Sequence, residues 1–529
     1  MAGVAGAFLL PSSNSQETVL DRLKHMLPKL ALRGQAGFGV AGFMHNKGVR
    51  YARSARSPSQ LSTIDYDEPD LGFRPHVAIA HVHGRWHRES EKRKNQPIQN
   101  HRAASSFLSI SVDGALVNSG ELREELLSHG DGLSGDTDAE LLLRLIEHAC
   151  EMRYWRHSRP VDYGDVFREI DSRIDGAISA LLLDGEGNLV GFRNRSGLRP
   201  LEFMRTDDGF LLFASENCAF GGLKGKIDQI LPGHIKYVDG KVGRCVNHCL
   251  SDDREGGKLC AYEALYLGSP ETSVHGRSHL ETRYNIGAAL GQVIARRLSS
   301  QFGSGPIIVC SMPRTGGPYA DGLFASLVKG GILAERLEII ATQSSHRTLL
   351  GAVSERKSLI ARKYRVVADN VTGRTIVVAD EALIRGDTSR AVTDMLLAGG
   401  AKAVHWAIGS PPIVAPNYYG MQIDTIEELA FWQIWKRLPP QQRKQCLRFH
   451  NMKPQTLGTI EKNIAAAINA SSVTHLPFSA LVNLLPRGSE GVDLSPFTFE
   501  MPTPAGQQRA DRNLSDLMSR VRRSELCLA

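Results

Sequence analysis

Short apolar segments alternate with polar turns through the first 240 residues of the chain. They occupy residues 3–10, 37–43, 76–82, 107–112, 178–184, 189–193, 209–215 and 234–238. Gly, Asp, Asn and Ser residues separate them, which is typical of strands in an antiparallel layered domain. Two further segments, 20–32 and 138–150, carry apolar residues at helical spacing. The pattern therefore predicts a layered α+β domain over residues 1–240.

From about residue 280 the sequence pattern changes, and predicted strands, loops and helices follow one another. Apolar segments of strand length begin at 305, 337 and 374, and loops or helical segments follow them. This alternation predicts an α/β domain with a parallel sheet, to which we assign residues 241–440. The last hundred residues are helical in pattern and end in a polar tail. We therefore expect a helical extension over residues 441–529.

Composition excludes several classes of protein. The chain has 529 residues, of which 42% are hydrophobic and 22% charged, so it can bury sizeable cores. Its net charge of +7 is spread along the chain; it suits an anionic small substrate and gives no reason to expect nucleic acid. No apolar run is long enough for a membrane span. Eight Cys without paired spacing indicate reduced thiols in the cytoplasm and no dedicated zinc site.

The segment 375–389 carries the strongest chemical signal. An apolar strand ends in two adjacent carboxylates, Asp380 and Glu381, and a Gly/Thr/Ser loop then opens an amphipathic helix. Ligands of parallel sheets lie beyond the carboxyl ends of the strands. A loop of this kind offers N–H groups, hydroxyls and a helix dipole to a phosphate, while the carboxylates suit a sugar diol or hydrated Mg²⁺. An ordinary strand–turn–helix with a capping Asp387 or Thr388 is the alternative.

Residues 378–389 resemble the ribose-phosphate signature of type I phosphoribosyltransferases. Segments 260–266, 346–348, 400–404, 410–413 and 419–420 resemble the amidophosphoribosyltransferase family and occur in the family's order. The resemblance implies a type I phosphoribosyltransferase fold that binds phosphoribosyl pyrophosphate with Mg²⁺ and transfers its sugar to an amine. It implies that Asp380 and Glu381 are catalytic and hold the Mg²⁺ indirectly. The implied ribose 5-phosphate loop consists of Arg385, Gly386, Asp387, Thr388 and Ser389.

The pyrophosphate side departs from the family's pattern. Loop 312–318 has Arg314 where the family usually has an acidic residue, and segment 341–343 lacks two of the family's cations. Arg356 and Lys363 are candidate contacts, for which a solvated basic loop is the alternative. The pyrophosphate-binding residues that the resemblance implies are Arg314, Thr315, Gly316, Arg347 and Lys363.

Segments 30–35, 95–97, 116–118, 197–201 and 214–216 resemble the family's glutaminase domain. The resemblance implies an N-terminal-nucleophile-hydrolase-like layered fold (αββα). The thiolate of an N-terminal Cys would attack the glutamine amide, with its α-amino group as base. This chain has Ala2 at that position, and a methyl group cannot attack a carbonyl. Glutamine hydrolysis is therefore predicted to be lost.

Other positions of the glutaminase site are altered as well. Asp113 precedes Gly114 where the family has an Asn, and an ionised carboxylate would repel a developing oxyanion. His83 lies near the position at which the family has its substrate-binding Arg. Asp138 has two alternative roles, as the N-cap of a helix or as a contact to the substrate. The degenerate site comprises Ala2, Arg33, His83, Asp113, Gly114 and Asp138. Cys260 aligns with one iron–sulfur ligand and Asn417 with the place of a second, so no cluster is expected.

Three hypotheses follow for function. The first is a phosphoribosyltransferase that uses ammonia or another small amine. The second is a non-catalytic sensor or partner subunit that binds phosphoribosyl pyrophosphate. The third is an ordinary glutamine-dependent amidophosphoribosyltransferase of purine synthesis, in which engineering placed Ala2 where the nucleophile stood. In each case we expect no nucleic acid or membrane partner, and the resemblance implies a homo-oligomer.

Overall fold

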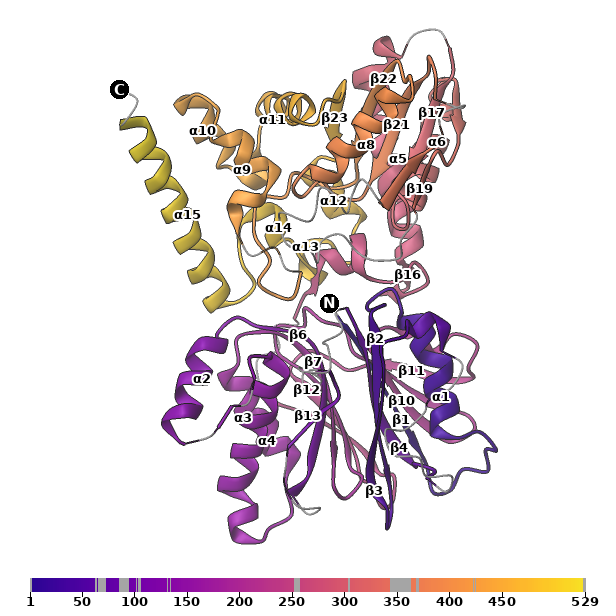
Figure 1. Ribbon diagram of the computed structural model, residues 1–529, viewed down its shortest axis with the longest axis vertical. Helices are drawn as coiled ribbons and strands as arrows, with labels where there is room; N and C mark the ends of the chain where they lie inside the picture. The colour runs from indigo at the N-terminus through magenta and orange to yellow at the C-terminus, as the bar shows by residue number, and fades with distance from the viewer. Residues whose placement is uncertain are drawn as a thin grey trace.

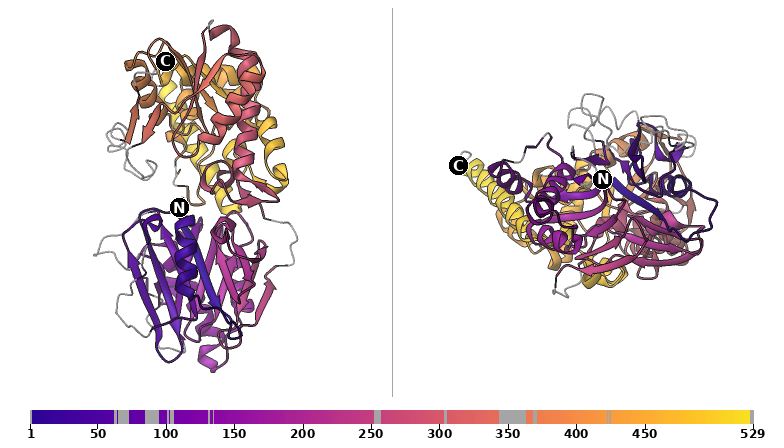
Figure 2. Two further views of the ribbon diagram at one scale, coloured as in Figure 1. Left: turned by 90° about the vertical axis from the view of Figure 1, so that its right-hand side faces the viewer. Right: turned by 90° about the horizontal axis from the view of Figure 1, so that it is seen from below.

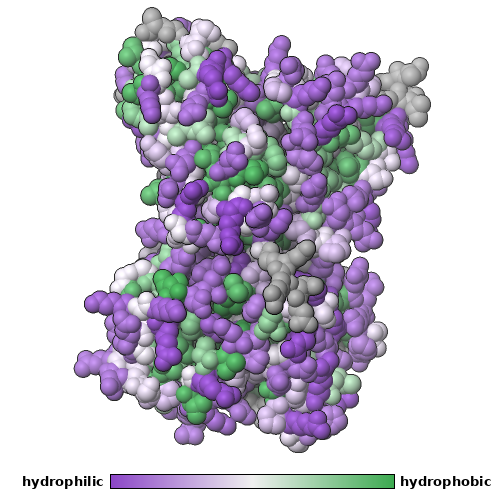
Figure 3. Space-filling model, turned by 180° about the vertical axis from the view of Figure 1, so that it is seen from behind, coloured by the Kyte–Doolittle hydropathy of each residue, from purple (hydrophilic) through white to green (hydrophobic). Residues whose placement is uncertain are grey.

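The computed structural model describes residues 2–61, 64, 73–84, 95–100, 102, 106–130, 132–133, 135–251, 257–302, 305–342, 363–367, 371–421, 423 and 425–526. The chain folds into two stacked lobes, and the N-terminus lies between them (Figures 1 and 2). In the space-filling view, the molecule is narrower at the junction of the two lobes (Figure 3). None of the helices in the described ranges is long and apolar enough to cross a bilayer.

Two antiparallel sheets form the N-terminal lobe. The seven-stranded sheet has the order β11-β9-β10-β1-β4-β2-β3, and the six-stranded sheet has the order β13-β12-β8-β7-β6-β5. The strands of the first are β1 (Ala2–Leu9), β2 (Gly37–Met44), β3 (Gly48–Ser54), β4 (Val77–His83), β9 (Glu202–Thr206), β10 (Phe210–Ala214) and β11 (Gly225–Gln229). Those of the second are β5 (Ile98–Gln99), β6 (Leu108–Leu116), β7 (Gly176–Asp184), β8 (Leu189–Arg193), β12 (His234–Val238) and β13 (Cys245–Cys249).

The two sheets pack face to face, with helices on their outer sides (Figure 1). Buried apolar side chains from both sheets, among them Phe8, Leu181 and Phe213, fill the space between them. Helix α1 (Val19–Met26) covers the first sheet. The helices over the second are α2 (Ser119–Ser128), α3 (Asp138–Arg153) and α4 (Tyr163–Arg173). The expected αββα arrangement is confirmed.

A five-stranded parallel sheet forms the centre of the C-terminal lobe, in the order β18-β17-β21-β22-β23. Its strands are β17 (Ile307–Ser311), β18 (Ala334–Arg336), β21 (Thr375–Asp380), β22 (Ala403–Ile408) and β23 (Ser472–His475). The expected α/β domain with a parallel sheet is confirmed. The apolar segment at 337–343 differs in detail, since β19 (Ile340–Thr342) leaves this sheet and pairs antiparallel with β20 (Tyr364–Val366).

Helices surround the parallel sheet and extend toward the C-terminus (Figure 1). They are α5 (His279–Leu298), α6 (Gly317–Lys329), α8 (Asp387–Ala398), α9 (Ala430–Trp435), α10 (Pro440–Cys446), α11 (Pro454–Ala467), α12 (Phe478–Leu484), α13 (Gly488–Gly491), α14 (Ser495–Thr498) and α15 (Pro504–Leu526).

Helices α5 and α6 pack closely against each other at two glycines. A Cβ added at Gly287 would lie 2.0 Å from the backbone oxygen of Tyr319, and one at Gly322 would lie 2.0 Å from that of Tyr284. This close contact fixes the axis of α6 against its neighbour.

Distant parts of the chain meet at the junction of the lobes. Strand β14 (Leu259–Cys260), which follows the N-terminal lobe, pairs in parallel with β24 (Val492–Asp493) from near the C-terminus. The backbone N–H of Ala505 donates to Oδ2 of Asp175 in the N-terminal lobe, at 2.9 Å. A short π-helix, η7 (Glu263–Leu267), leads from β14 toward α5. Short strands β15 (Ser273–Val274) and β16 (Arg277–Ser278) complete this connection.

A buried ionic cluster lies at the centre of this junction. Arg33 donates to both oxygens of Glu263, at 2.8 and 3.0 Å, and to Asp113 Oδ2 at 2.7 Å. It also donates to Glu216 Oε1 at 3.1 Å. Arg199 donates to Glu263 Oε1 at 2.6 Å. All five side chains are at most 2% exposed. Four of them belong to the N-terminal lobe, so Glu263 joins that lobe to the next.

Replacing Glu263 with Ala should destabilise the whole protein. The variant leaves the guanidinium groups of Arg33 and Arg199 buried with fewer anionic partners, and we expect it to lose about 3–5 kcal/mol of unfolding free energy in urea titrations. Glu186→Ala is the matched control, because that carboxylate is 58% exposed in its pair with Lys241. An equal loss in both variants would contradict the proposed importance of the cluster.

The contribution of Glu263 should also depend on pH. Burial by itself would raise its pKa, but the charges of Arg33 and Arg199 lower the pKa to about 2, from an ordinary value of 4.5. The stabilisation is therefore complete above pH 4.5 and is lost as the pH falls toward 2. The difference in melting temperature between wild type and Glu263→Gln should be large at neutral pH and shrink through that window. A constant difference across that window would show that charge is not the cause.

Candidate active site

A cavity of about 170 Å³ lies at the carboxyl edge of the parallel sheet. Strands β17 and β21 are neighbours in that sheet, and the loops that follow both of them line the cavity. Of the residues that the sequence assigned to the sugar-phosphate site, the structure brings ten to this cavity. They are Arg314, Thr315, Lys363, Asp380, Glu381, Arg385, Gly386, Asp387, Thr388 and Ser389.

The loop after β21 ends in a helix N-terminus. Gly386 has a φ of +89°, a left-handed conformation that favours glycine, and it precedes the first residue of α8. Thr388 and Ser389 in the first turn line the cavity, and first-turn N–H groups have no partners within their own helix. Asp387 is exposed to solvent, so water screens its carboxylate. The turn is thus suited to hold a phosphate.

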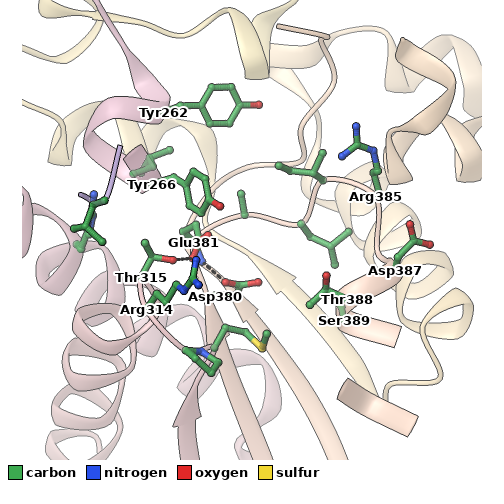
Figure 4. A pocket seen from close by; sticks show the side chains of 18 of the residues that line it. Tyr262, Tyr266, Arg314, Thr315, Asp380, Glu381, Arg385, Asp387, Thr388 and Ser389 are labelled. Atoms are coloured by element: carbon green, nitrogen blue, oxygen red, sulfur yellow. Dashed lines mark hydrogen bonds between the residues drawn. The ribbon is translucent and has the colours of Figure 1, made fainter. Parts of the chain in front are cut away.

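Two carboxylates stand at the end of β21 (Figure 4). Asp380 Oδ1 accepts the N–H of Glu381 at 3.1 Å, and Glu381 Oε2 accepts the hydroxyl of Thr315 at 2.7 Å. Burial, and then the adjacent charge of Glu381, raise the pKa of Asp380. Two poorly solvated acids placed together favour a proton or a cation between them.

The loop after β17 forms the opposite side of this edge. Arg314 has a φ of +87°, which costs a non-glycine residue of order 1–3 kcal/mol and is most often found at ligand sites. Its side chain lies beside Thr315 and the acidic pair (Figure 4). Gly316, predicted to bind pyrophosphate, is the N-cap of α6, and its N–H donates to Met312 O at 3.2 Å. It does not line the cavity, because its backbone turns back into the loop.

The remaining predicted cations have different surroundings. Arg385 Nε donates to Glu428 Oε2 at 2.5 Å. Lys363 is 7% exposed, and its ammonium lies 5.2 Å from the centre of the Tyr364 ring. Arg347 and Arg356 lie outside the described residues. Besides Arg385, three described cations line the cavity, namely Arg314, Lys363 and Arg283, and the last of these donates to the backbone oxygens of Ala264 and Gly268.

The sequence missed several further residues on the cavity wall, among them two tyrosines and two residues of the N-terminal lobe. Tyr262 and Tyr266 come from the segment around η7, and Leu32 and Gln35 come from the N-terminal lobe. The Tyr262 hydroxyl is buried without a hydrogen-bond partner. All four residues lie in segments that carried the family resemblance, but only the docking of the two lobes shows that they face the cavity.

Four of the residues predicted to form a degenerate glutaminase site lie around the N-terminal strand β1. Ala2 on β1 is directly opposite His83 on β4. Arg33 Nε donates to the backbone oxygen of Ala2 at 2.9 Å, while its Nη2 donates to Asp113 Oδ2. His83 Nδ1 lies 3.1 Å from Nδ1 of His81. Ala2, Arg33, His83 and Asp113 are thus brought together, in a site whose guanidinium and carboxylate are already paired.

Gly114 and Asp138 have structural explanations. Gly114 has a φ of +128°, and a Cβ there would lie 1.7 Å from the backbone oxygen of Ala177. Asp138 accepts the N–H of Leu116 at 3.0 Å, and burial raises its pKa. The N-cap of α3 is Thr137, so the capping role considered for Asp138 belongs to its neighbour.

Three members of the ionic cluster were not predicted from the sequence. Glu216, Glu263 and Arg199 complete the coordination of Arg33 and Asp113. Glu216 also accepts from the Ser269 N–H at 2.6 Å and from the Thr272 hydroxyl at 2.5 Å. Charged residues inside apolar segments of the sequence indicate buried ionic groups. The sequence does not reveal which residues are the partners of these groups.

Metal-binding groups are sparse in the described part of the chain. No group of three or more His, Cys, Asp or Glu side chains there is placed to hold a metal ion. Asp380 and Glu381 supply two adjacent carboxylates, which suits a hydrated cation shared with a phosphorylated ligand. Cys260 is buried, and burial raises its pKa to about 12.

Comparisons with known proteins agree with this architecture. A family model described as "Glutamine amidotransferase domain" matches residues 83–221. An amidophosphoribosyltransferase of Archaeoglobus fulgidus is 28% identical over 440 residues, covering 81% of this chain and 87% of that protein. Amidophosphoribosyltransferase 1, chloroplastic, of Arabidopsis thaliana is 29% identical over 445 residues, covering 83% and 72%.

The fold has a solved counterpart over nearly its whole length. Glutamine phosphoribosylpyrophosphate amidotransferase from B. subtilis, complexed with ADP and GMP, superposes with a TM-score of 0.72 at 22% identity. The match covers 96% of this chain and 98% of that one, so the two-lobed architecture is the same. The chain is thus similar in sequence to amidophosphoribosyltransferases over most of its length, and it shares the two-lobed fold of this solved structure.

Proposed function

We propose that the protein binds phosphoribosyl pyrophosphate at the cavity and transfers the phosphoribosyl group to ammonia or another small amine. One observation carries the proposal. Two neighbouring parallel strands end at one cavity, which is lined by the first turn of α8, the acidic pair and the cations Arg314 and Lys363. This order of groups suits a sugar with phosphate groups at both ends.

Each part of the cavity has a role in this reaction. The turn of Thr388 and Ser389 holds the 5-phosphate, and Arg314 and Lys363 balance the charge of the pyrophosphate. Asp380 and Glu381 orient the ribose hydroxyls and stabilise positive charge at C1. The bond from C1 to the pyrophosphate oxygen breaks with its electron pair on pyrophosphate. The amine's lone pair then forms the C–N bond, and its surplus proton leaves with the pyrophosphate.

Magnesium fits this site as a companion of the substrate. The raised pKa of Asp380, caused by burial and by the charge of Glu381, indicates an acidic pair that a cation would stabilise. Asp380 and Glu381 would hold hydrated Mg²⁺ on the ribose side. When bound, the ion supplies positive charge against the leaving pyrophosphate.

The N-terminal lobe is proposed to have lost glutamine hydrolysis. Ala2 offers no nucleophile, and Arg33 engages Asp113 in the place of an oxyanion donor. An anionic side chain there opposes the negative charge that amide attack would develop. The lobe then serves to complete the cavity wall through Leu32 and Gln35.

Binding without turnover is the second candidate, and one observation favours it. The Arg385 guanidinium is engaged by Glu428, so the phosphate loop has less free positive charge than its sequence suggests. Calorimetric titration with phosphoribosyl pyrophosphate and Mg²⁺ tests both candidates, and pyrophosphate release in the presence of ammonia or other amines separates them. Heat without release would select the sensor, and no heat would reject both.

Neutralising the acidic pair should abolish transfer. In Asp380→Asn/Glu381→Gln, we expect pyrophosphate release with ammonia to fall by about 100-fold or more, because the charge that faces C1 and the cation is removed. Asp394→Asn is the control, since that carboxylate is exposed on α8. Unchanged release in the double variant would contradict the assigned roles.

Restoring a thiol at the N-terminus should not restore glutamine hydrolysis. We expect Ala2→Cys, with the initiator Met removed, to release no glutamate above the wild-type background, because Asp113 and Arg33 still occupy the site as an ion pair. A coupled glutamate dehydrogenase assay measures this. Rapid glutamate release would instead favour an ordinary enzyme whose nucleophile had been replaced.

A further inference from the structure

The loop after β21 is attached at two points to η11 (Ile426–Glu428), a short 3-10 turn that precedes α9. The N–H of Ala430 donates to the backbone oxygen of Ile384 at 2.8 Å. One residue further along the loop, Arg385 Nε donates to Glu428 Oε2 at 2.5 Å. Arg385 also lines the cavity, on the same turn as the proposed phosphate-binding hydroxyls (Figure 4). One guanidinium therefore belongs both to an ion pair within the protein and to the wall of the proposed phosphate site.

The charges around this loop do not favour a doubly charged phosphate. Arg385 contributes one positive charge, while Asp387 and Glu428 contribute two negative charges. The next cation on α8, Arg390, pairs with Asp394 of the same helix. The positive end of the dipole of α8 is equivalent to about half a charge. The immediate surroundings of the loop thus have no excess of positive charge with which to attract the phosphate.

Of the two carboxylates, Glu428 has the stronger influence on Arg385. In their pair the Arg385 side chain is 9% exposed and that of Glu428 is 32% exposed, so water screens their charges only in part. Asp387, by contrast, is exposed to solvent. A phosphate that approaches Arg385 must therefore compete with a carboxylate that already accepts a hydrogen bond from it.

We propose that Glu428 sets the affinity of the phosphate loop, because it competes with the 5-phosphate of the sugar donor for Arg385. This inference rests on the proposed binding of phosphoribosyl pyrophosphate and identifies the residue that weakens it. When the donor binds, Arg385 exchanges the carboxylate for a phosphate oxygen, and Glu428 turns toward solvent. The exchange replaces one charge-assisted hydrogen bond with another, so the phosphate gains little net free energy from Arg385.

The test measures by calorimetry the affinity of Glu428→Gln for phosphoribosyl pyrophosphate, ribose 5-phosphate and pyrophosphate. We expect the affinity for both ligands that carry a 5-phosphate to rise by about 3- to 10-fold, because a negative charge near that phosphate is removed. The affinity for pyrophosphate, which is proposed to bind at Arg314 and Lys363, should not change. The gain should be smaller at high salt than at low salt.

Glu427→Gln is the matched control. Glu427 is the adjacent residue, is 29% exposed, and also pairs with an arginine, Arg520 of α15. Neither Glu427 nor Arg520 lines the cavity, so this variant should leave all three affinities unchanged. Glu428→Asp keeps the charge but withdraws it by one methylene group. It should give a smaller gain, and it replaces the Gln variant if that variant does not fold.

The outcomes separate this inference from the function on which it rests. An unchanged affinity of Glu428→Gln for ribose 5-phosphate would overturn the inference, and a lower affinity would show that Glu428 instead holds Arg385 in place for the phosphate. An equal gain in Glu427→Gln would overturn it as well. Wild-type binding of phosphoribosyl pyrophosphate without a gain in the variant would leave the proposed function intact. If neither protein gives heat with phosphoribosyl pyrophosphate, the proposed function itself is wrong.

Discussion

The buried ion pair between Arg33 and Glu263 is the contact on which the two-lobed structure depends. It is bidentate, it is shielded from water, and Asp113, Glu216 and Arg199 extend it into a cluster. Charges in such a place are stable only when every partner is present, because the desolvation of each ion must be offset by its neighbours. The lobes must therefore dock in one position, and a small displacement would leave an unpaired charge in an apolar surrounding.

That constraint extends directly to the cavity. Glu263 is the first residue of the π-helix that carries Leu265 and Tyr266 to the cavity wall, and Arg33 is two residues from Gln35. The cluster thus holds two walls of the cavity that come from different lobes. The contact of Gly287 with Tyr319 holds α6, whose N-terminus follows the Arg314 loop, in the same way. A binding site at a domain junction is rigid only when the contacts that support it are also rigid.

Local signals in the sequence were sufficient for much of this structure. The layered lobe, the parallel sheet and the cavity residues between Asp380 and Ser389 follow from periodicity, turn chemistry and a short motif. The ionic cluster could not be predicted in this way, because the partners of Arg33 lie 80, 183 and 230 residues away along the chain. Strand β19 was misplaced for a related reason, since an apolar run of strand length does not specify its neighbour.

The pairing of β14 with β24 joins residues 259–260 to residues 492–493. The edge strand β23 of the parallel sheet likewise ends only at His475. A ribosome must therefore finish nearly the entire polypeptide before either the sheet or the lobe junction can close. The N-terminal lobe, whose strands are all made by residue 249, can assemble earlier and wait as a template. A lobe that carries Ala2 on its first strand would in this way have a role during biosynthesis, as the surface on which the later half folds.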